Sequence, residues 1–263
     1  MEQSHSRYVA FGSRLAGVPE VVTLGVKPNF HDYTPLEQQQ IHGASVILYP
    51  TLNYAQFFTT MGKRIFPSVE TYLYADEKMK QTTLFNMLSI PHPRTRFYLQ
   101  REFSRIAQEF AFPFVAKIPR ASARGRGVFK VTCAADLELY LQKTKIAYIQ
   151  EYIPHDRDLR VILINYEPVL AYWRNRISDD FRTNLHQGGE IDFDDIPYHV
   201  MPMVRDFARR CNFNDVGLDL LHYKGVWYLI EANMQYGREG FKKKNMVLKE
   251  VIRQKLLDGS LLS

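Results

Sequence analysis

The first seventy or so residues alternate between short apolar runs and helical segments. The runs that predict strands are residues 21–24, 45–49 and 64–66. A helix is predicted to begin at Thr34, because Thr34 and Glu37 have capping-box spacing and Pro35 suits a first helical turn. A second helix is predicted over 54–61. Strands that alternate with helices predict a small parallel α/β unit, and it carries no glycine fingerprint of a dinucleotide site.

A new pattern begins near residue 75. Helical spacing of apolar residues covers 76–88, and the prolines of 90–93 end that helix because proline disfavours helix before it. The elements expected next are a strand at 113–118, a glycine-containing turn at 121–127, a returning strand at 128–131 and a helix over 134–142. This order predicts a hairpin whose turn has the size of a phosphate-binding loop.

The last part of the chain predicts a second group of strands. Apolar runs that suggest antiparallel core strands are residues 148–152, 159–165 and 169–174. They are followed by a polar, glycine-bearing stretch at 178–197, a helix around 199–211, strands at 216–221 and 227–232, and a basic closing helix.

Composition limits the class of protein. With 263 residues, 46% of them hydrophobic, the chain is long and apolar enough to form a hydrophobic core. Its two cysteines, Cys133 and Cys211, have neither disulfide-framework nor zinc-site spacing, and we interpret both as buried thiols in a reducing compartment. The first residues lack the apolar run of a signal peptide, so we expect a cytoplasmic protein without membrane association. A net charge of +6 favours an anionic ligand and leaves nucleotide, acidic substrate and nucleic acid open.

The strongest chemical signal is a set of oxygen ligands near the C-terminal end. Asp219 lies in one apolar strand, and Glu231 and Asn233 end the next. Strand alternation places Glu231 and Asn233 on one face, and a neighbouring strand brings Asp219 beside them. Two carboxylates and an amide oxygen suit Mg²⁺ that bridges triphosphate oxygens. The alternative is a solvated hairpin with incidental acids.

Two features upstream suit phosphates. Lys117 ends an apolar strand, where its ammonium needs an anion or must reach water. The loop after it contains Ser122, Gly125 and Gly127, and glycines allow the positive φ of a backbone nest that binds phosphate. Neither feature is specific alone.

Two further segments suit a nucleotide. A strand runs into a connection at Glu151, Tyr152 and Ile153, where backbone groups can meet an adenine edge, and Asp158 follows at a distance that suits a ribose hydroxyl. An ordinary strand end and a surface acid is the competing interpretation. The stretch 181–189, which contains Arg182, Asn184 and His186, reads as an anion-handling loop. Arg174 and Arg176 on the preceding strand face either this loop or solvent.

Taken in order, these segments resemble the ATP-grasp superfamily, and most closely its RimK-type carboxylate-amine ligases. The resemblance covers about residues 75 to 245 and depends on the order and spacing of Lys78, Lys117, the glycine loop, Gln-Glu-Tyr-Ile, Asp-Leu-Arg, the 181–189 segment, Gly-Leu-Asp and Glu-Ala-Asn. It implies an α/β (α+β) ATP-grasp fold in which two α+β lobes hold the nucleotide. The implied domains are a small leading domain at 1–74, an N-terminal lobe at 75–148 and a C-terminal lobe at 149–263.

The resemblance also implies roles. Lys78, Lys117 and the loop at Ser122, Gly125 and Gly127 would reach the nucleotide phosphates. Glu151, Tyr152 and Ile153 would hold adenine, and Asp158 the ribose. The residues implied in phosphoryl transfer are Arg182, Asn184 and Arg174, and the implied metal ligands are Asp219, Glu231 and Asn233. The implied cofactors are ATP and Mg²⁺, with Mn²⁺ as an alternative ion.

The sequence departs from the family pattern in three places. Ser122 stands where the family usually has glycine, and Arg124 and Arg126 follow it. After Glu231-Ala-Asn233, Gln235 and Tyr236 replace the Ser-Pro that is usual in the family, which puts the acceptor pocket in doubt. The leading domain is short, so its substrate residues cannot be carried over.

Three functions follow as hypotheses. The first is a ligase that activates a carboxylate as an acyl phosphate and joins it to an amine, with small-molecule or peptide substrates. The second is an ATP-grasp kinase of a small hydroxylated molecule. The third is a basic RNA- or ribosome-binding module with regulatory nucleotide, although the basic residues suit solvated helix faces better than nucleic acid. A homo-oligomer is left open, and no general base is assignable.

Overall fold

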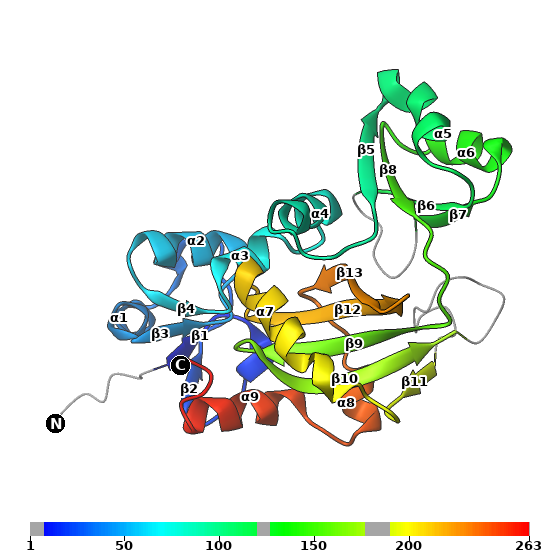
Figure 1. Ribbon diagram of the computed structural model, residues 1–263. Coiled ribbons are helices and arrows are strands. Elements are labelled where there is room, and N and C mark those ends of the chain that lie inside the picture. Colours follow the sequence, from blue (N-terminus) through cyan, green and yellow to red (C-terminus); the bar gives the residue numbers. More distant parts are fainter. Residues whose placement is uncertain (1–7, 120–126, 177–189, 263) are drawn as a thin grey trace.

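The computed structural model describes residues 8–119, 127–176 and 190–262. Three sheets build the chain: a parallel sheet in the leading unit (β1–β4), an antiparallel sheet in the N-lobe (β5–β8) and a second antiparallel sheet in the C-lobe (β9–β13). Figure 1 shows the leading unit on the left, the C-lobe at the centre and the N-lobe at the upper right. The predicted order of a small parallel unit followed by two α+β lobes is confirmed.

The leading unit has the predicted alternation of strands and helices. Its elements are β1 (Tyr8–Ala10), η1 (Ser13–Leu15), β2 (Val21–Thr23), η2 (Phe30–Asp32), α1 (Pro35–Gly43), β3 (Val46–Leu48), α2 (Leu52–Thr60) and β4 (Arg64–Phe66). The capping box of α1 is confirmed, because the Glu37 amide donates to Thr34 Oγ1 at 3.3 Å and the Thr34 amide donates to Glu37 Oε2 at 2.6 Å. The strand order is β2-β1-β3-β4, so β1, which the apolar pattern did not predict, is an inner strand.

This strand order creates a switch point between β1 and β3. The chain leaves β1 toward β2 on one side, and β3 pairs with β1 on the other. In open parallel sheets, ligands bind in the crevice beyond the carboxyl ends of strands at such a point. The segments that follow these strands, 12–14 and 49–51, therefore define a candidate binding edge.

The N-lobe contains β5 (Thr95–Leu99), η3 (Gln100–Arg105), α5 (Ile106–Glu109), β6 (Phe114–Lys117), β7 (Val128–Val131), α6 (Ala134–Leu141) and β8 (Ile146–Glu151). Its strand order is β5-β8-β6-β7, and the predicted hairpin is the β6–β7 pair. The predicted turn at 121–127 lies, except for Gly127, outside the described residues. Cys133 precedes α6 and is exposed, so its prediction as a buried thiol is wrong, whereas Cys211 is buried.

The C-lobe contains β9 (Arg157–Ile164), β10 (Glu167–Asn175), β11 (Glu190–Asp192), η6 (Tyr198–Val200), α7 (Met201–Cys211), β12 (Asp215–Tyr223) and β13 (Val226–Asn233). The order β11-β10-β9-β12-β13 makes β13 an edge strand. One face of the sheet packs on α7 through apolar residues such as Val204 and Phe207. The predicted domain boundaries stay predictions, and the one after residue 148 falls inside β8.

Four further helices connect these parts: α3 (Val69–Leu73), α4 (Lys78–Met87), α8 (Glu239–Lys243) and α9 (Leu248–Leu257). Figure 1 shows α4 above β13, between the leading unit and the N-lobe, and α9 beneath the leading unit. Residues of β1, β3, β9, β10 and α9 share one apolar core, so the leading unit and the C-lobe are packed as one body. No helix in the described ranges is long and apolar enough to cross a membrane.

Candidate active site

A cavity of about 120 Å³ lies between the N-lobe and C-lobe sheets. The sequence-predicted residues that line it are Lys117, Glu151, Tyr152, Ile153, Asp158, Arg174, Asp219 and Glu231. They come from both sheets and from the connection between β8 and β9, and their common location was predicted from the sequence. Ser122, Gly125, Arg182, Asn184 and His186 lie outside the described residues.

Lys117 ends β6 with its side chain buried in the cavity wall. Lys117 is only 6% exposed, and its ammonium forms no ion pair in the described part of the chain. Burial lowers the pKa of Lys117 to about 8; Glu231 and Asp219 oppose this shift, and the Lys78 charge adds to it. A buried ammonium without a close counter-ion is unfavourable, so this position calls for an anionic ligand.

Asp219 is buried opposite Lys117 and is held by two arginines. Arg160 donates to both Asp219 oxygens at 2.6 Å, and Arg174 reaches Oδ2 at 2.9 Å. Burial raises the pKa of Asp219, but the two guanidinium groups outweigh burial and bring it below its ordinary value. Arg174 also donates to Asp158 Oδ1 at 2.6 Å. Arg174 is therefore buried in a charge network, whereas Arg176 pairs with the exposed Asp156.

Glu231 lies directly across the β12–β13 ladder from Asp219, as strand alternation predicted. The ladder register shifts next to this pair, which leaves Ile230 as an extra residue in β13. A bulge turns consecutive side chains toward the same side, and both Ile230 and Glu231 line the cavity. Lys78 contacts Glu231 Oε1 at 3.1 Å from α4. The helix thus supplies a second lysine to the site, as the resemblance implied.

Asn233 lies two residues after Glu231 in β13, opposite Gly217 of β12. Its side-chain oxygen accepts a hydrogen bond from the Gln235 amide at 3.0 Å. Unlike Asp219 and Glu231, Asn233 does not line the cavity. As a metal ligand Asn233 remains a prediction.

The connection from β8 to β9 forms one wall beside the strand that enters the N-lobe. The Glu151 amide donates to the Arg94 carbonyl at 2.9 Å, and the Arg94 amide donates to Glu151 Oε1 at 2.7 Å. The Glu151 carboxylate is thus used within the chain, so an adenine ring would be recognised by backbone groups of 151–153. The ring of Tyr152 lies 4.2 Å beneath the Lys130 ammonium.

Sequence reasoning assigned no role to three groups that lie next to the site, outside the cavity lining. Arg160 neutralises Asp219, and Gln81 and Thr82 of α4 contact the C-lobe and N-lobe respectively. The Asp-Leu-Arg segment contains Arg160, but one arginine among apolar residues does not reveal which carboxylate it meets. The contacts of α4 join residues 66 or more positions apart, which no local pattern predicts.

The donor set fits magnesium held jointly with phosphate. Within the described ranges no three His, Cys, Asp or Glu side chains converge to hold a metal. Mg²⁺ in nucleotide sites is commonly held by one or two carboxylates together with substrate phosphates, which is what Asp219 and Glu231 offer. Among the described residues, the charged side chains that meet here are Lys78, Lys117, Arg160, Arg174, Asp158, Asp219 and Glu231. With four cations against three carboxylates in this described set, a bare divalent cation is disfavoured, whereas a metal–polyphosphate complex is not.

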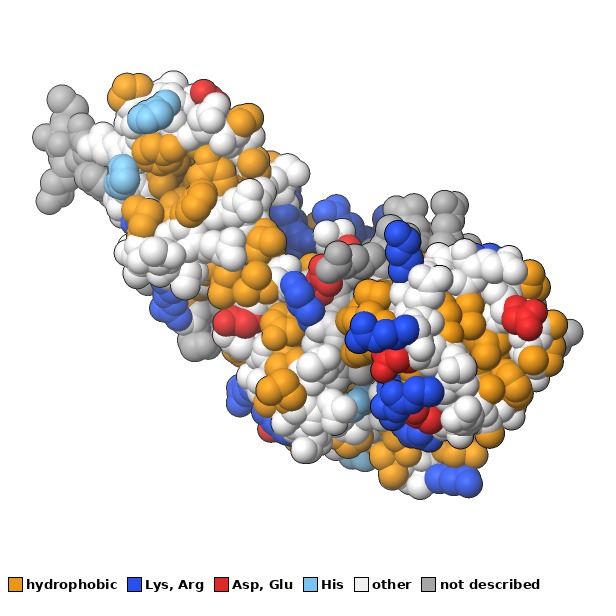
Figure 2. All heavy atoms as spheres, turned by 90° about the horizontal axis from the view of Figure 1, so that it is seen from above, with side chains coloured by type: hydrophobic (Ala, Val, Ile, Leu, Met, Phe, Trp, Pro, Cys, Tyr) orange, Lys and Arg blue, Asp and Glu red, His pale blue; other side chains and the backbone are white. Residues whose placement is uncertain are grey.

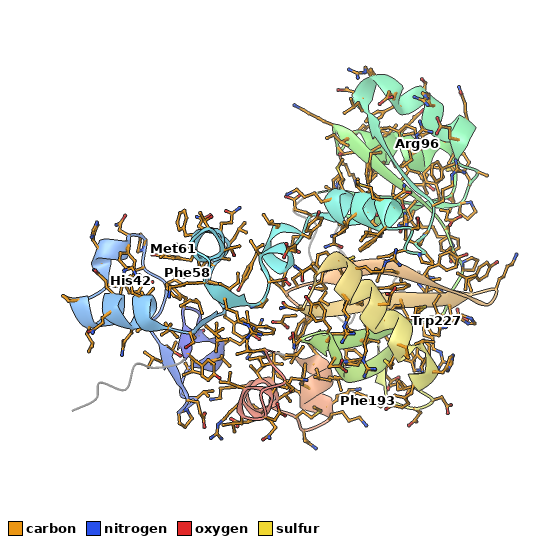
Figure 3. The ribbon with its side chains drawn as sticks, turned by 60° about the vertical axis from the view of Figure 1, so that its left-hand side comes forward. His42, Phe58, Met61, Arg96, Phe193 and Trp227 are labelled. Carbon is orange, nitrogen blue, oxygen red and sulfur yellow. The ribbon has the colours of Figure 1, made fainter. Side chains whose placement is uncertain are left out.

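The leading unit carries an apolar patch that lies apart from the charged site. Figure 2 shows Lys and Arg side chains between the leading unit on the left and the N-lobe on the right, and others over the N-lobe itself. It also shows an apolar patch over the leading unit, and Figure 3 places His42, Phe58 and Met61 there, away from the lobes. These residues line a separate groove of about 540 Å³ that contributes nothing to the charged site.

A model of the RimK-like ATP-grasp domain matches residues 75–258, which include the whole cavity lining. The chain belongs to the RimK-like ATP-grasp family. The three-sheet architecture is accordingly the ATP-grasp fold, with the parallel leading unit ahead of the matched region.

Individual relatives agree with this assignment. Coenzyme gamma-F420-2:alpha-L-glutamate ligase of Methanococcus maripaludis is 28% identical over 189 residues, or 66% of this chain and 64% of that enzyme. The match therefore spans slightly less than two thirds of the relative. Probable alpha-L-glutamate ligase 2 of Pseudoalteromonas atlantica is 26% identical over 208 residues, 76% of this chain and 68% of that protein. The fold alone is also similar to that of the ATP-grasp ligase PsnB, solved with minimal precursor, Mg and ADP, with a TM-score of 0.70 at 16% identity over 96% of this chain and 98% of that one.

Proposed function

We propose that this RimK-like protein is an ATP-dependent ligase that activates a carboxylate as an acyl phosphate and joins it to an amine. The observation that carries the proposal is the buried Lys117 ammonium, which forms no ion pair with any described residue, in one cavity between two lobes with the carboxylates Asp219 and Glu231. This arrangement provides a positive charge for a polyphosphate and oxygen ligands for its metal.

The cavity supports phosphoryl transfer by position and charge. Such a transfer needs little covalent participation from the protein, so lysines, arginines and a metal are sufficient. Lys117 would hold the phosphates from the N-lobe and Lys78 from α4, while backbone groups of 151–153 would hold the base. ATP supplies the γ-phosphoryl group, and Mg²⁺ held by Asp219 and Glu231 would offset its charge.

The cavity must open for a nucleotide. Its volume of about 120 Å³ is below the roughly 300 to 1,000 Å³ of ligand pockets. The N-lobe is joined to the rest by residues 88–94 and 152–156. Rotation of the N-lobe about these two connections would admit the nucleotide and bring Lys117 down on its phosphates.

We infer that the amine is an acidic amino acid of the glutamate type, as the names of the relatives suggest. A hollow of about 630 Å³ lies at the switch point of the leading sheet and is lined by Arg14, Tyr49, Tyr236 and Arg238. Arg14 is committed to the buried Asp215 at 3.0 Å, whereas Arg238 is exposed and has no ion pair within the described part of the chain. Arg238 is therefore the group proposed to meet a substrate carboxylate.

The test is an assay of ADP, phosphate and product mass with ATP, Mg²⁺, L-glutamate and a panel of carboxylates, including carboxyl-terminal peptides. We expect ADP and phosphate to form in equal amounts with an amide product. Asp219→Ala and Glu231→Ala should abolish this reaction, while Glu138→Ala on the exposed face of α6 should not. ADP release with a stable phosphorylated product would replace the ligase by a kinase, and no ATP consumption with any acceptor would refute the proposal.

A further inference from the structure

Gln81 of α4 lies against the outer edge of β13. Its side-chain Nε2 donates to the Ala232 carbonyl at 2.8 Å, and the Ala232 amide donates to its Oε1 at 3.0 Å. Nε2 donates a second hydrogen bond, to the Tyr74 carbonyl at 2.8 Å. Gln81 is 2% exposed and lies outside the cavity lining, so its amide serves the protein and not a ligand.

The contact between Gln81 and Ala232 lies at the edge of the C-lobe sheet. β13 is the edge strand of the C-lobe sheet, and an edge strand presents unpaired backbone groups along its outer side. The Gln81 amide has the donor and acceptor of a peptide group, so it pairs with Ala232 as one residue of a further strand would. Ala232 stands between Glu231, the metal ligand that β13 is proposed to provide, and Asn233, whose role as a ligand remains a prediction from the sequence.

We propose that Gln81 is a positioning residue that fixes β13 so that Glu231 and Asn233 face a nucleotide-bound metal; this rests on the proposed function. The bulge at Ile230 makes such support necessary, because a bulge interrupts the regular ladder with β12 next to Glu231. Without the Gln81 amide, the buried backbone groups of Ala232 lose both partners, and the peptide planes that aim Glu231 and Asn233 are free to turn.

The neighbouring contacts of α4 have a different role. Thr82 Oγ1 lies 2.8 Å from the Tyr148 hydroxyl in β8, and the Tyr148 ring lies 5.4 Å from the Lys117 ammonium. Lys78, one turn before Gln81, touches the Glu231 side chain itself. Of these three α4 residues, Gln81 alone is hydrogen-bonded to the backbone of β13. Its loss should therefore weaken Mg²⁺ binding and leave Lys78 and Lys117 in place.

The experiment measures ADP binding calorimetrically over a series of Mg²⁺ concentrations, which requires no turnover. Gln81→Met removes the amide at nearly constant side-chain length. The matched control is Gln38→Met, because Gln38 also donates its side-chain amide to a backbone carbonyl, that of Tyr33 at 2.8 Å, in the leading unit. Outer groups that orient metal ligands typically contribute about 10- to 100-fold in metal affinity.

We expect Gln81→Met to bind ADP without Mg²⁺ as the unmodified protein does, and to need about 10-fold more Mg²⁺ for tight binding. The Gln38→Met protein should match the unmodified one in both measurements. An unchanged Mg²⁺ requirement in Gln81→Met would overturn the inference, and so would an equal loss of affinity with and without Mg²⁺, which indicates general damage. If the unmodified protein shows no Mg²⁺-dependent ADP binding, the proposed function fails as well.

A second measurement needs no variant. The Ala232 amide of the unmodified protein should exchange its hydrogen slowly by NMR although it lies on an edge strand, because Gln81 accepts its hydrogen bond. Should Gln81→Met not fold, this measurement decides: slow exchange supports the inference, and exchange at the rate of an exposed edge amide overturns it.

Discussion

Replacing Lys117 by methionine should make the ligand-free protein more stable while it removes nucleotide binding. Burial lowers the pKa of Lys117 to about 8, which means that the folded chain holds this charge at a cost. Against an unfolded value near 10.4, and at about 1.4 kcal/mol per pKa unit, the cost is about 3 kcal/mol. Methionine has similar length and no charge, and Glu231 and Asp219 keep their own partners, Lys78 and the two arginines.

The pH dependence follows from the direction of the shift. Because the folded pKa lies below the unfolded one, the cost is complete below about pH 8, declines as the pH rises toward the unfolded value, and disappears above it. The stability difference between Lys117→Met and the unmodified protein should therefore be largest at pH 7 and vanish above about pH 10.4.

The assay is denaturant or thermal unfolding of both proteins across this pH range, with and without Mg²⁺ and ADP. Lys145→Met, on the exposed surface of the N-lobe, controls for the loss of one lysine and should change neither quantity. We expect ADP to stabilise the unmodified protein by mass action and to leave Lys117→Met unchanged. A Lys117→Met protein that is less stable at pH 7, or a difference that does not depend on pH, would refute the electrostatic reasoning.

Three other substitutions probe the surrounding network. Asp219→Asn should destabilise the fold by about 3 to 5 kcal/mol in denaturant titration, since it leaves the buried Arg160 without a full counter-charge; a loss below 1 kcal/mol would contradict this. Thr82→Val should cost about 1 kcal/mol through its lost hydroxyl contact and leave the Mg²⁺ requirement for ADP binding unchanged in calorimetry. Tyr236→Phe removes the 2.6 Å hydrogen bond to Asp215 and should raise the KM for the amine more than the KM for ATP. Equal effects on the two KM values would count against the proposed place of the amine.

The parts of the site that follow from strand geometry were predictable. Alternation along an antiparallel pair brought Asp219 and Glu231 together, and the awkward position of Lys117 at the end of an apolar strand indicated an anion. These inferences use only the period of a strand and the cost of burying charge, both of which are local. The bulge at Ile230 could not be predicted from local sequence, because it depends on how β13 fits against its partner strand and against α4.

Other parts could not be predicted because they depend on tertiary partners. Arg174 was ambiguous in the sequence, since an arginine on a strand is buried only if carboxylates such as Asp158 meet it. Strand β1 escaped detection because its short apolar run gives too little pattern, and its inner position comes from two neighbours. Cys133 was misassigned because it stands where a strand gives way to α6, and such a junction lies at the surface.

The metal strand and the proposed amine pocket share one short segment, which bears on how the two half-reactions meet. Glu231 faces the cavity and Tyr236 lines the hollow, and five residues of chain span at most about 17 Å even when extended. The hydrogen bond from the Gln235 amide to Asn233 folds this segment and shortens it further. In the proposed reaction, an acyl phosphate formed beside Glu231 would therefore lie close to an amine bound in the hollow. Gln235 and Tyr236, which stand where the family pattern has Ser-Pro, fall in this segment, so we expect them to affect the proposed amine pocket and not the strand proposed to carry the metal ligands.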